Sequence, residues 1–371
     1  MGIVVQKYGG SSVTDVARLF QVADRVVETV RQGHQVVVTV SAMGNTTSEL
    51  LALAQSVSRQ PGRRELDLLI SVGERVSMTL LAMAIADRGV PAASFTGSQS
   101  GIITDERHIA AQVIEVRPHR IEKALSEGKV AIVAGFQGVS RTGEVTTLGR
   151  GGTDATAVVL AAALGAAYCE ICSDVDGVYT ADPRVVPAAR RIDTLPLDGA
   201  VAMSQAGARV LQAAALSYAR AHNITLRANA TRRPPGEGTV LPPGATPDAV
   251  TAITTDTQLT HCRLPDLTDL PADLTPAAWW QAADGVHLLL DTRNRHGGAP
   301  LPARWTDLGA VATVSAIGRC AVTDPDTVRR AAAAVPQATR WWASGATWSA
   351  LIPPDAAAAA QRSLHAALIE A

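Results

Sequence analysis

Lysine is scarce in this chain of 371 residues. It occurs only at positions 7, 123 and 129, and arginine supplies the rest of the 33 strong cations. The net charge is −1 at pH 7, so the charge balance gives no reason to expect binding to nucleic acid or to an anionic membrane. Because no apolar run reaches ~18 residues without a charge, we also expect no membrane span.

Signals that would define several other classes are missing too. No basic amino-terminal region precedes an apolar stretch, so we expect no signal peptide, and the four cysteines fit a reducing cytoplasm. Cys169 and Cys172 match C-x-x-C, but residues three apart on a strand face opposite sides, so we expect two buried thiols and no shared metal. The sequence GxxxxGK followed by Ser or Thr is absent, which excludes the P-loop class.

Hydrophobic residues make up 47% and charged residues 18%, which indicates a soluble globular protein, and the length indicates two or more domains. Short apolar runs alternate with segments of helical spacing, which predicts a largely parallel sheet covered on both faces. The predicted strands are residues 3–8, 35–40, 91–95, 130–134 and 168–173. The predicted helices are residues 14–32, 46–59, 63–88, 118–127 and 153–164. A hairpin tip is expected at residues 141–143.

Residues 232–247 are rich in proline and glycine and are predicted to form a linker. Beyond them the composition changes, and all six tryptophans lie at or after Trp279. Segments 311–317 and 348–352 are each followed by an alanine-rich helical stretch, which predicts a small α+β module. We therefore expect one domain at 1–231 and a second at 248–371.

Lys7 stands where the first predicted strand runs into a glycine turn, Gln-Lys-Tyr-Gly-Gly-Ser-Ser. A chain that otherwise uses arginine has a lysine here, which indicates a need for a compact, mobile ammonium. Gly9, Gly10 and Ser11 would supply donors to phosphate oxygens beside that charge. Taken alone, the motif could equally be a structural turn.

The sequence Gly149-Arg-Gly-Gly-Thr-Asp opens a predicted helix, whose first N–H groups, at Gly151 and Gly152, favour an anion. Arg150 can bind a carboxylate through two hydrogen bonds. Asp154 lies in the first helical turn, where it could simply complement the helix dipole. An arginine and an aspartate this close together suit a zwitterionic amino acid, with one charge for each end of the ligand.

Further motifs are Ser41-Ala-Met-Gly-Asn-Thr-Thr and the continuation of the glycine motif through Ser-Asp-Val-Asp-Gly-Val-Tyr to Arg184. Together with the two motifs above, they resemble the aspartate kinases of the amino-acid-kinase family over residues 3 to about 228, where five motifs fall in the family's order. The resemblance implies an α/β amino-acid-kinase fold and transfer of a phosphoryl group from ATP to the β-carboxylate of L-aspartate, which gives 4-phospho-L-aspartate. Such chemistry depends on positioning and charge neutralisation more than on covalent steps. The residues expected to contribute most directly are Lys7, Asp174 and Arg150.

The resemblance also assigns a substrate pocket. Ser41 and Thr47 follow the second predicted strand, where ligands bind in α/β sheets, although Thr46 or Thr47 could merely cap the next helix. Glu74 is placed near the substrate ammonium by the resemblance, whereas the sequence alone favours a salt bridge to a nearby arginine, Arg75 or Arg63. Arg150, Gly151, Gly152 and Asp154 complete the predicted substrate site.

A loop after the last predicted strand, Ser-Asp-Val-Asp-Gly-Val-Tyr, surrounds the nucleotide in the family. The predicted ATP contacts in and after it are Ser173, Asp174, Tyr179, Asp182 and Arg184, in addition to Lys7, Gly9, Gly10 and Ser11. Asp174 and Asp176 suit Mg²⁺ by type, and we expect the metal to be held mainly by the ATP phosphates. Arg209 stands where the family usually has lysine, so the charge needed for nucleotide binding is retained.

In the family, paired ACT domains follow the kinase domain. The Pro-Gly turn and Asn-Ile segment that bind lysine or threonine there are absent from residues 254–284, whereas residues 363–368 resemble the domain's last helix. We therefore expect a degenerate ACT-like domain that supports a homodimer or higher homo-oligomer, with feedback by lysine and threonine weakened or lost. The pairs Trp279-Trp280 and Trp341-Trp342 would pack either an interface or a core.

Two alternatives stay open. A kinase of the same fold could act on another amino-acid carboxylate, although the retained pocket motifs count against this. A catalytically silent regulatory subunit would usually lose the phosphate lysine or the metal aspartate, and both Lys7 and Asp174 are present.

Overall fold

The computed structural model describes residues 2–149, 151–209, 211–271, 274, 276–292 and 301–370. The chain divides into two compact units. The first comprises described residues within Met1–Val178, Ile192–Asp198 and Val210–Gly244, and the second those within Tyr179–Arg191, Gly199–Arg209 and Ala245–Ala371. Each unit is made of three separate segments of the chain, whereas the sequence predicted two continuous domains joined by a linker at residues 232–247.

Among the described residues of the first unit, seven strands form the main sheet, in the order β11-β10-β9-β1-β2-β6-β3. They are β1 (Ile3–Tyr8), β2 (Gln35–Val40), β3 (Ala92–Phe95), β6 (Val130–Ala134), β9 (Tyr168–Ser173), β10 (Leu226–Ala230) and β11 (Thr239–Leu241). All neighbours pair in parallel except β10 and β11. The predicted linker thus contains β11, which forms the edge of this sheet.

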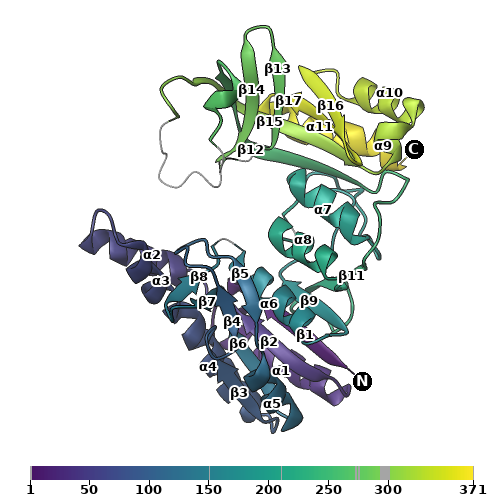
Figure 1. Cartoon of the computed structure of the whole chain (residues 1–371). Coiled ribbons are helices and arrows are strands. Elements are labelled where there is room, and N and C mark those ends of the chain that lie inside the picture. Colours follow the sequence, from purple (N-terminus) through teal and green to yellow (C-terminus); the bar gives the residue numbers. More distant parts are fainter. Residues whose placement is uncertain are drawn as a thin grey trace. The chain divides into compact units, whose positions relative to one another are not determined.

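The described helices of the first unit are α1 (Val16–Arg31), α2 (Thr46–Val57), α3 (Arg63–Ile70), α4 (Val72–Ala86), α5 (His119–Ser126), α6 (Gly152–Ala163) and α8 (Ala213–Ala221). Helices α1, α4, α5 and α6 pack on the main sheet, as the alternation predicted, whereas α2 and α3 pack against each other and project to one side of it (Figure 1). Helices α1 and α4 share a buried core with alternate residues of β2, namely Val36, Val38 and Val40. Helix α6 contacts β1, β2 and β9 and packs against α8. The interleaving residues of β2 are buried too, as expected for a parallel strand covered on both sides.

Local signals explain where α1 begins and ends. The side chain of Asp15 caps the first turn by accepting a hydrogen bond from the amide of Arg18. Gly33, at φ 88°, follows the last turn in the left-handed conformation that glycine adopts without strain.

The predicted helix at residues 63–88 is wrong in one respect, because it is broken at Ser71 into α3 and α4. The combined stretch Arg63–Ala86 is long and apolar enough to cross a membrane by length and composition, and half of its most apolar window is buried inside the protein. Met78, Leu81 and Ile85 of this stretch lie in the core beneath the main sheet. A core helix of a folded domain gives the same composition, so the stretch is weak evidence for a membrane span.

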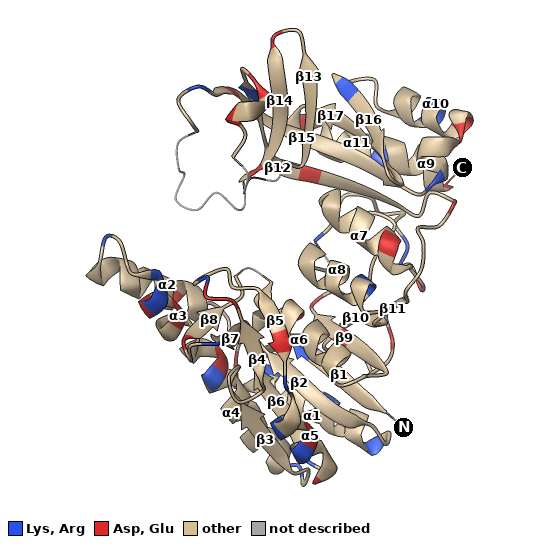
Figure 2. Ribbon diagram, viewed as in Figure 1, with Lys and Arg blue, Asp and Glu red and all other residues tan. Residues whose placement is uncertain are grey.

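A second, smaller sheet belongs to the first unit, with the order β5-β4-β7-β8. Its strands are β4 (Ile102–Thr104), β5 (Val113–Val116), β7 (Gln137–Ser140) and β8 (Val145–Thr147). The β7–β8 hairpin turns at residues 141–143, as predicted. Strands β4 and β5 were not predicted, because three or four residues are too few to show a period. Figure 2 shows that charged residues are rare on the central strands of the main sheet.

The second unit is built on an antiparallel sheet of order β13-β14-β12-β15-β17-β16. Its strands are β12 (Ala252–Leu264), β13 (Ala278–Ala282), β14 (Gly285–Asp291), β15 (Thr306–Ile317), β16 (Arg340–Ser344) and β17 (Thr347–Ile352). Its helices are α9 (Cys320–Thr323), α10 (Pro325–Ala334) and α11 (Ala357–His365). Helix α7 (Leu197–Gln205) falls mainly in this unit.

The two halves of this second sheet are covered differently. Helices α10 and α11 pack with β15 and β17 around the fully buried Trp348. On β12 and β14, Leu264 and Leu288 pack instead with Trp305, and the described residues between β12 and β13 contain only the short 3₁₀ turn Leu267–Asp269.

The opposite face of the sheet contains a small core of its own, made by Leu259, Leu289 and Leu351 with Trp280 and Trp342. The guanidinium of Arg340 on the edge strand β16 lies 4.7 Å from the ring centre of Trp280 on the opposite edge strand, β13. The sheet must therefore be strongly curled to bring its two edges together. One tryptophan of each predicted pair therefore packs in this core, while Trp279 and Trp341 are 54% and 52% exposed.

Candidate active site

The candidate site lies at the carboxyl ends of β1 and β2 in the first unit. β1 is flanked by β2 on one side and β9 on the other, and this change in strand order is where α/β sheets bind ligands. The turns after β1 and β2 touch: the amide of Gly44 donates to the carbonyl of Gly10 over 3.3 Å. A Cβ atom at Gly10 would lie 3.0 Å from the carbonyl oxygen of Ala42, so glycine permits this approach.

Lys7 and Asp154 form an ion pair at the carboxyl end of β1. The ammonium nitrogen of Lys7 lies 2.7 Å from Oδ1 of Asp154, and the two side chains are 13% and 10% exposed. Lys7 is the penultimate residue of β1, and Asp154 lies in the first turn of α6. Because both side chains are largely shielded from water, the Coulomb attraction between their charges is stronger than at an exposed site. The pair joins the residue predicted to bind phosphate to the one predicted to bind an amino acid.

The start of α6 is held by close backbone packing. Gly151 precedes the helix at φ 76°, a conformation that favours glycine. A Cβ atom at Gly152 would approach Leu148 and Phe136 to 2.9 Å, and one at Gly135 would approach Cγ2 of Thr153 to 2.5 Å. The anion site expected at the first N–H groups of this helix stays a prediction, because the amide of Gly152 donates to the carbonyl of Gly149 over 3.0 Å in the structure. The prediction for Arg150 lies outside the described residues.

Ser41 and Thr47 occupy the turn after β2 and the helix that follows it. The hydroxyl of Ser41 donates to Oγ1 of Thr153 over 3.0 Å and so joins this turn to α6. Thr47 is partly exposed in the first turn of α2. Neither it nor Thr46 is the capping residue, since Asn45 holds that position without a side-chain cap.

Glu74 is a buried carboxylate beside the same turn. It is 3% exposed on α4, and its Oε1 accepts a hydrogen bond from the amide of Ala42 over 3.1 Å. Its Oε2 has no hydrogen-bond partner among the described residues. Burial raises the pKa of Glu74 to about 7, against the lowering effect of backbone hydrogen bonds. The salt bridge between Glu74 and Arg75 that the sequence alone favoured does not form, because the guanidinium of Arg75 donates to Gln137 instead.

A pocket of about 480 Å³ opens beside these turns. It is lined by Ser11, Thr14, Met43, Gly44, Asn45, Thr46 and Glu49. Ser11, predicted as a phosphate donor, is exposed and lies in the one-turn 3₁₀ helix Gly10–Val13. Gly9 packs against the lysine, with a Cβ position 3.2 Å from its ammonium nitrogen.

The end of β9 lies beside the same edge. The hydroxyl of Ser173 accepts a hydrogen bond from the amide of Val175, and the Ser173 carbonyl accepts one from Thr231. The hydroxyl of Thr231 in turn lies 2.7 Å from that of Ser12. Asp174 is exposed, whereas Asp176 forms an ion pair of 3.1 Å with Arg233. Of the two carboxylates predicted to suit a metal, Asp174 is therefore the one in solvent.

The remaining predicted nucleotide residues belong to the second unit. They are Tyr179, Asp182, Arg184 and Arg209. The guanidinium of Arg184 bonds to the carboxylate of Asp182, at 2.7 Å in the closest contact. Because these residues lie in a different unit from Lys7, their part in the site stays a prediction.

Within the described residues, no cluster of three or more His, Cys, Asp or Glu side chains could hold a metal ion. Cys169 and Cys172 are both fully buried free thiols, as predicted. Burial raises the pKa of the Cys169 thiol, and also that of Cys172, which disfavours thiolates at these positions.

Two residues near the site, Thr153 and Asp67, were not predicted from the sequence to have a role there. Thr153 bonds to Ser41 across α6 and β2, and Asp67 joins α3 to the segment before α6. The Gly-Gly-Thr-Asp motif marked the region of Thr153, but no sequence signal indicates its partner. Nothing in the sequence indicates the contacts of Asp67 with residues 41 to 80 positions away.

Known proteins resemble this chain in sequence. The profile of the amino acid kinase family matches residues 2–227. The aspartokinase of Mycobacterium tuberculosis is 54% identical over 244 residues, which is 65% of this chain and 57% of that protein. That of Corynebacterium glutamicum is 54% identical over 228 residues, 61% of this chain and 54% of that protein. The chain therefore spans little more than half the length of these relatives.

A solved structure resembles the whole chain. Escherichia coli aspartokinase III in complex with aspartate and ADP matches with a TM-score of 0.85, 25% identity and coverage of 99% of both chains. The fold is therefore that of an α/β protein, and the chain belongs to the amino acid kinase family. Within that family, it is similar to the aspartokinases in both sequence and structure.

Proposed function

We propose that this protein is an aspartate kinase, which transfers a phosphoryl group from ATP to the β-carboxylate of L-aspartate and forms 4-phospho-L-aspartate. The observation that carries the proposal is the ion pair between Lys7 and Asp154. The resemblance gives Lys7 to a phosphate and Asp154 to an amino-acid ammonium. At 2.7 Å from one another, these two groups would bring both reactants to one place, which is the main requirement of phosphoryl transfer.

The substrate pocket is proposed on the same edge of the sheet. Asp154 and the buried Glu74 offer carboxylates to the ammonium, and Arg150 offers a guanidinium to a carboxylate. Ser41, in the turn after β2, and Thr47, in the first turn of α2, are proposed to contact the substrate. Gly151 and Gly152 are proposed to contact it at the start of α6, where the amide of Gly152 would have to leave its hydrogen bond to Gly149 or share it. An ammonium placed near Glu74 would favour its ionised form and so compensate the cost of its burial.

ATP is the proposed phosphoryl donor, since the structural match with E. coli aspartokinase III is to a complex with aspartate and ADP. Lys7, with the amides of Gly9, Gly10 and Ser11, would hold phosphate oxygens, and Ser173 and Asp174 would contact the nucleotide from β9. Magnesium, when bound, neutralises phosphate charge. A single exposed carboxylate, Asp174, fits a metal held mainly by phosphates. Tyr179, Asp182, Arg184 and Arg209 are proposed as further nucleotide contacts.

The second unit is proposed to serve regulation or assembly. We assign residues 1–231 to the kinase domain and 248–371 to an ACT-like domain that supports a homodimer or a higher homo-oligomer. Feedback by lysine and threonine is proposed to be weakened or lost, because residues 254–284 contain neither the Pro-Gly turn nor the Asn-Ile segment. A cytoplasmic location follows from the proposed role in amino-acid biosynthesis.

The first test is ADP release by the full chain with ATP, Mg²⁺ and L-aspartate, compared with L-glutamate and with no amino acid. Release that depends on aspartate supports the proposal. Release with glutamate alone would favour a kinase for another amino-acid carboxylate. No release with either would favour a silent regulatory subunit.

Replacing Lys7 by Met tests the proposed phosphate cation with little change in volume. We expect kcat to fall by about 10²- to 10³-fold, the usual effect of removing one preorganised charge donor from a reacting group. Lys123→Met is the matched control, because Lys123 is exposed on α5 and lies outside the proposed site. A Lys7→Met variant that folds and turns over at the wild-type rate would remove Lys7 from the mechanism.

A further inference from the structure

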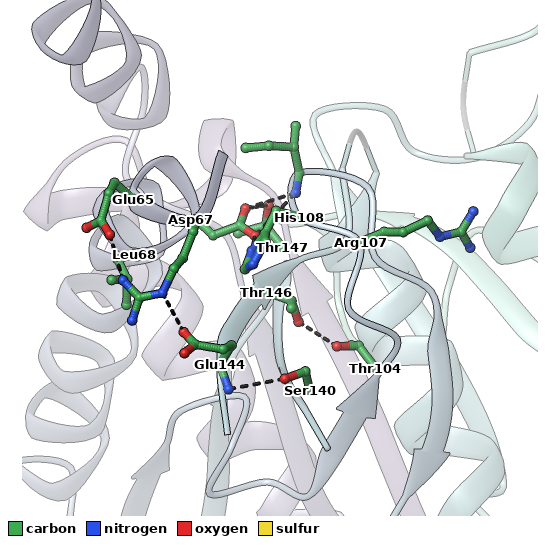
Figure 3. Close-up of polar contacts among 12 residues, drawn as sticks. Glu65, Asp67, Leu68, Thr104, Arg107, His108, Ser140, Glu144, Thr146 and Thr147 are labelled. Carbon is green, nitrogen blue, oxygen red and sulfur yellow. Dashed lines mark hydrogen bonds and ion pairs between the residues drawn. The ribbon is translucent and has the colours of Figure 1, made fainter. Parts of the chain in front are cut away.

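A buried carboxylate with no place in the proposed chemistry lies on α3. Asp67 is 0% exposed. Its Oδ1 accepts a hydrogen bond of 2.5 Å from the hydroxyl of Thr147, and its Oδ2 lies 2.7 Å from Nδ1 of His108 (Figure 3). The amide of Ile109 donates to both oxygens, over 3.1 and 3.2 Å. One side chain therefore ties together α3, the end of β8 and the loop between β4 and β5.

The loop that Asp67 binds has a strained backbone at Ile109, the residue whose amide donates to the carboxylate. Ile109 has φ 75°, in the left-handed region that β-branched residues rarely adopt. Such a conformation persists only where surrounding contacts over-determine it. The two hydrogen bonds from the Ile109 amide to Asp67 are contacts of this kind.

The strained loop lies directly against the segment that leads into α6. The amide of Ala111 donates to the carbonyl of Thr147 over 2.9 Å. A Cβ atom at Gly149 would be 3.1 Å from the carbonyl oxygen of Ile109, and Gly149 itself has φ 72°. The carbonyl of Gly149 then accepts a hydrogen bond from the amide of Gly152, the first residue of α6.

We propose that Asp67 is a positioning residue that, through Thr147 and the loop at Ile109, fixes the turn opening α6 and thereby sets binding of the amino-acid substrate. This inference rests on the proposed function, because the turn carries Gly151 and Gly152 and leads to Asp154. Asp67 is at the far end of the chain of contacts and does not itself touch the reacting groups. Small displacements of such a turn are costly, since misplacement by about 1 Å can cost 10²-fold in rate.

The variant that tests the proposal is Thr147→Val, which removes one hydroxyl with almost no change in shape. Thr147→Ser retains the hydroxyl and serves as the rescue. Thr146→Val is the matched control: its hydroxyl is equally buried and makes a pair of 2.6 Å with Thr104, but the residue faces the other side of β8. Figure 3 shows the two pairs apart from one another.

Two readouts are measured on the full chain. The first is the KM for aspartate and for ATP in the ADP-release assay. We expect Thr147→Val to raise the KM for aspartate roughly tenfold and to leave the KM for ATP within about twofold, with Thr147→Ser and Thr146→Val close to wild type. The second is hydrogen exchange of a peptide covering residues 148–155. We expect exchange of this peptide to be about tenfold faster in Thr147→Val than in Thr146→Val.

The two proposals fail in different ways. If wild type shows no aspartate-dependent ADP release, the proposed function is wrong, and the exchange measurement still decides whether Asp67 and Thr147 fix the turn. If wild type is active but Thr147→Val matches Thr146→Val in KM and in exchange, the positioning role is overturned. A loss of active protein at unchanged KM would also overturn it, because that is the result of a purely structural contact.

Discussion

Replacing Glu74 by Gln should make the protein more stable at alkaline pH while it weakens substrate binding. The buried carboxyl has a pKa of about 7 in the folded chain, against 4.5 as its ordinary value, and burial is the main cause. Glutamine has the shape of the neutral carboxyl and can accept the same hydrogen bond from Ala42. The variant therefore separates the cost of charge at this position from the effect of shape.

The magnitude follows from the linkage between ionisation and folding. Below pH 4.5 the carboxyl is neutral in both the folded and the unfolded chain, so it adds no pH dependence. As the pH rises from 4.5 to about 7 the unfolded chain ionises while the folded chain resists, and the folded wild type loses stability. A difference of about 2.5 pH units at 1.36 kcal/mol each corresponds to about 3 kcal/mol at pH 8.

The assay is unfolding of the first unit at pH 5 and pH 8. All six tryptophans lie at or after Trp279, so far-UV circular dichroism is a better signal than tryptophan fluorescence. Glu74→Gln should be within about 1 kcal/mol of wild type at pH 5 and more stable by about 3 kcal/mol at pH 8. Glu49→Gln, at an exposed position of α2, is the control for removing a negative charge. A gain that is the same at both pH values, or absent at pH 8, would refute the reasoning.

Two further predictions concern packing and regulation. Gly135→Ala should destabilise the first unit by about 1–3 kcal/mol, because the added Cβ would lie 2.5 Å from Cγ2 of Thr153, whereas Gly62→Ala should be nearly neutral with no atom within 4 Å; urea unfolding of both variants checks this. Lysine and threonine together, at millimolar concentration, should leave aspartate-dependent ADP release within about twofold of its uninhibited rate. This corresponds to a Kd for each effector that is no lower than millimolar. Strong inhibition in the same assay would mean that the second unit has an effector site after all.

Much of the fold was predictable because it depends on local patterns. The valine-rich run of β2 marked a buried parallel strand, and the glycine at position 33 marked the end of α1. The site turns were predictable for a similar reason, since Gly9 and Gly10 and the glycines before α6 occur at positions where the backbone must approach closely. For Asp154, the sequence predicted binding of the substrate ammonium or an interaction with the helix dipole, and it did not predict the ion pair with Lys7.

Other features depend on contacts between distant residues and could not be read along the chain. The break at Ser71 lies within a continuous helical pattern, and β11 lies within a segment rich in proline and glycine. The burial of Glu74 against Ala42 decides its pKa, and nothing in the residues around either position shows that the two meet. The clamp made by Asp67 joins residues 67, 108 and 147, which no period connects.

The sequence by itself determined the class of the main sheet, most of the helices and strands along the chain, the glycine turns and the residue types at the strand ends. These follow from hydrophobic period and from the conformational freedom of glycine, which are properties of short segments. Only the tertiary structure decided which charges meet, which carboxylates lose water and which loop is held in strain. Those outcomes depend on distance and burial, and these are set when segments far apart in the chain pack together.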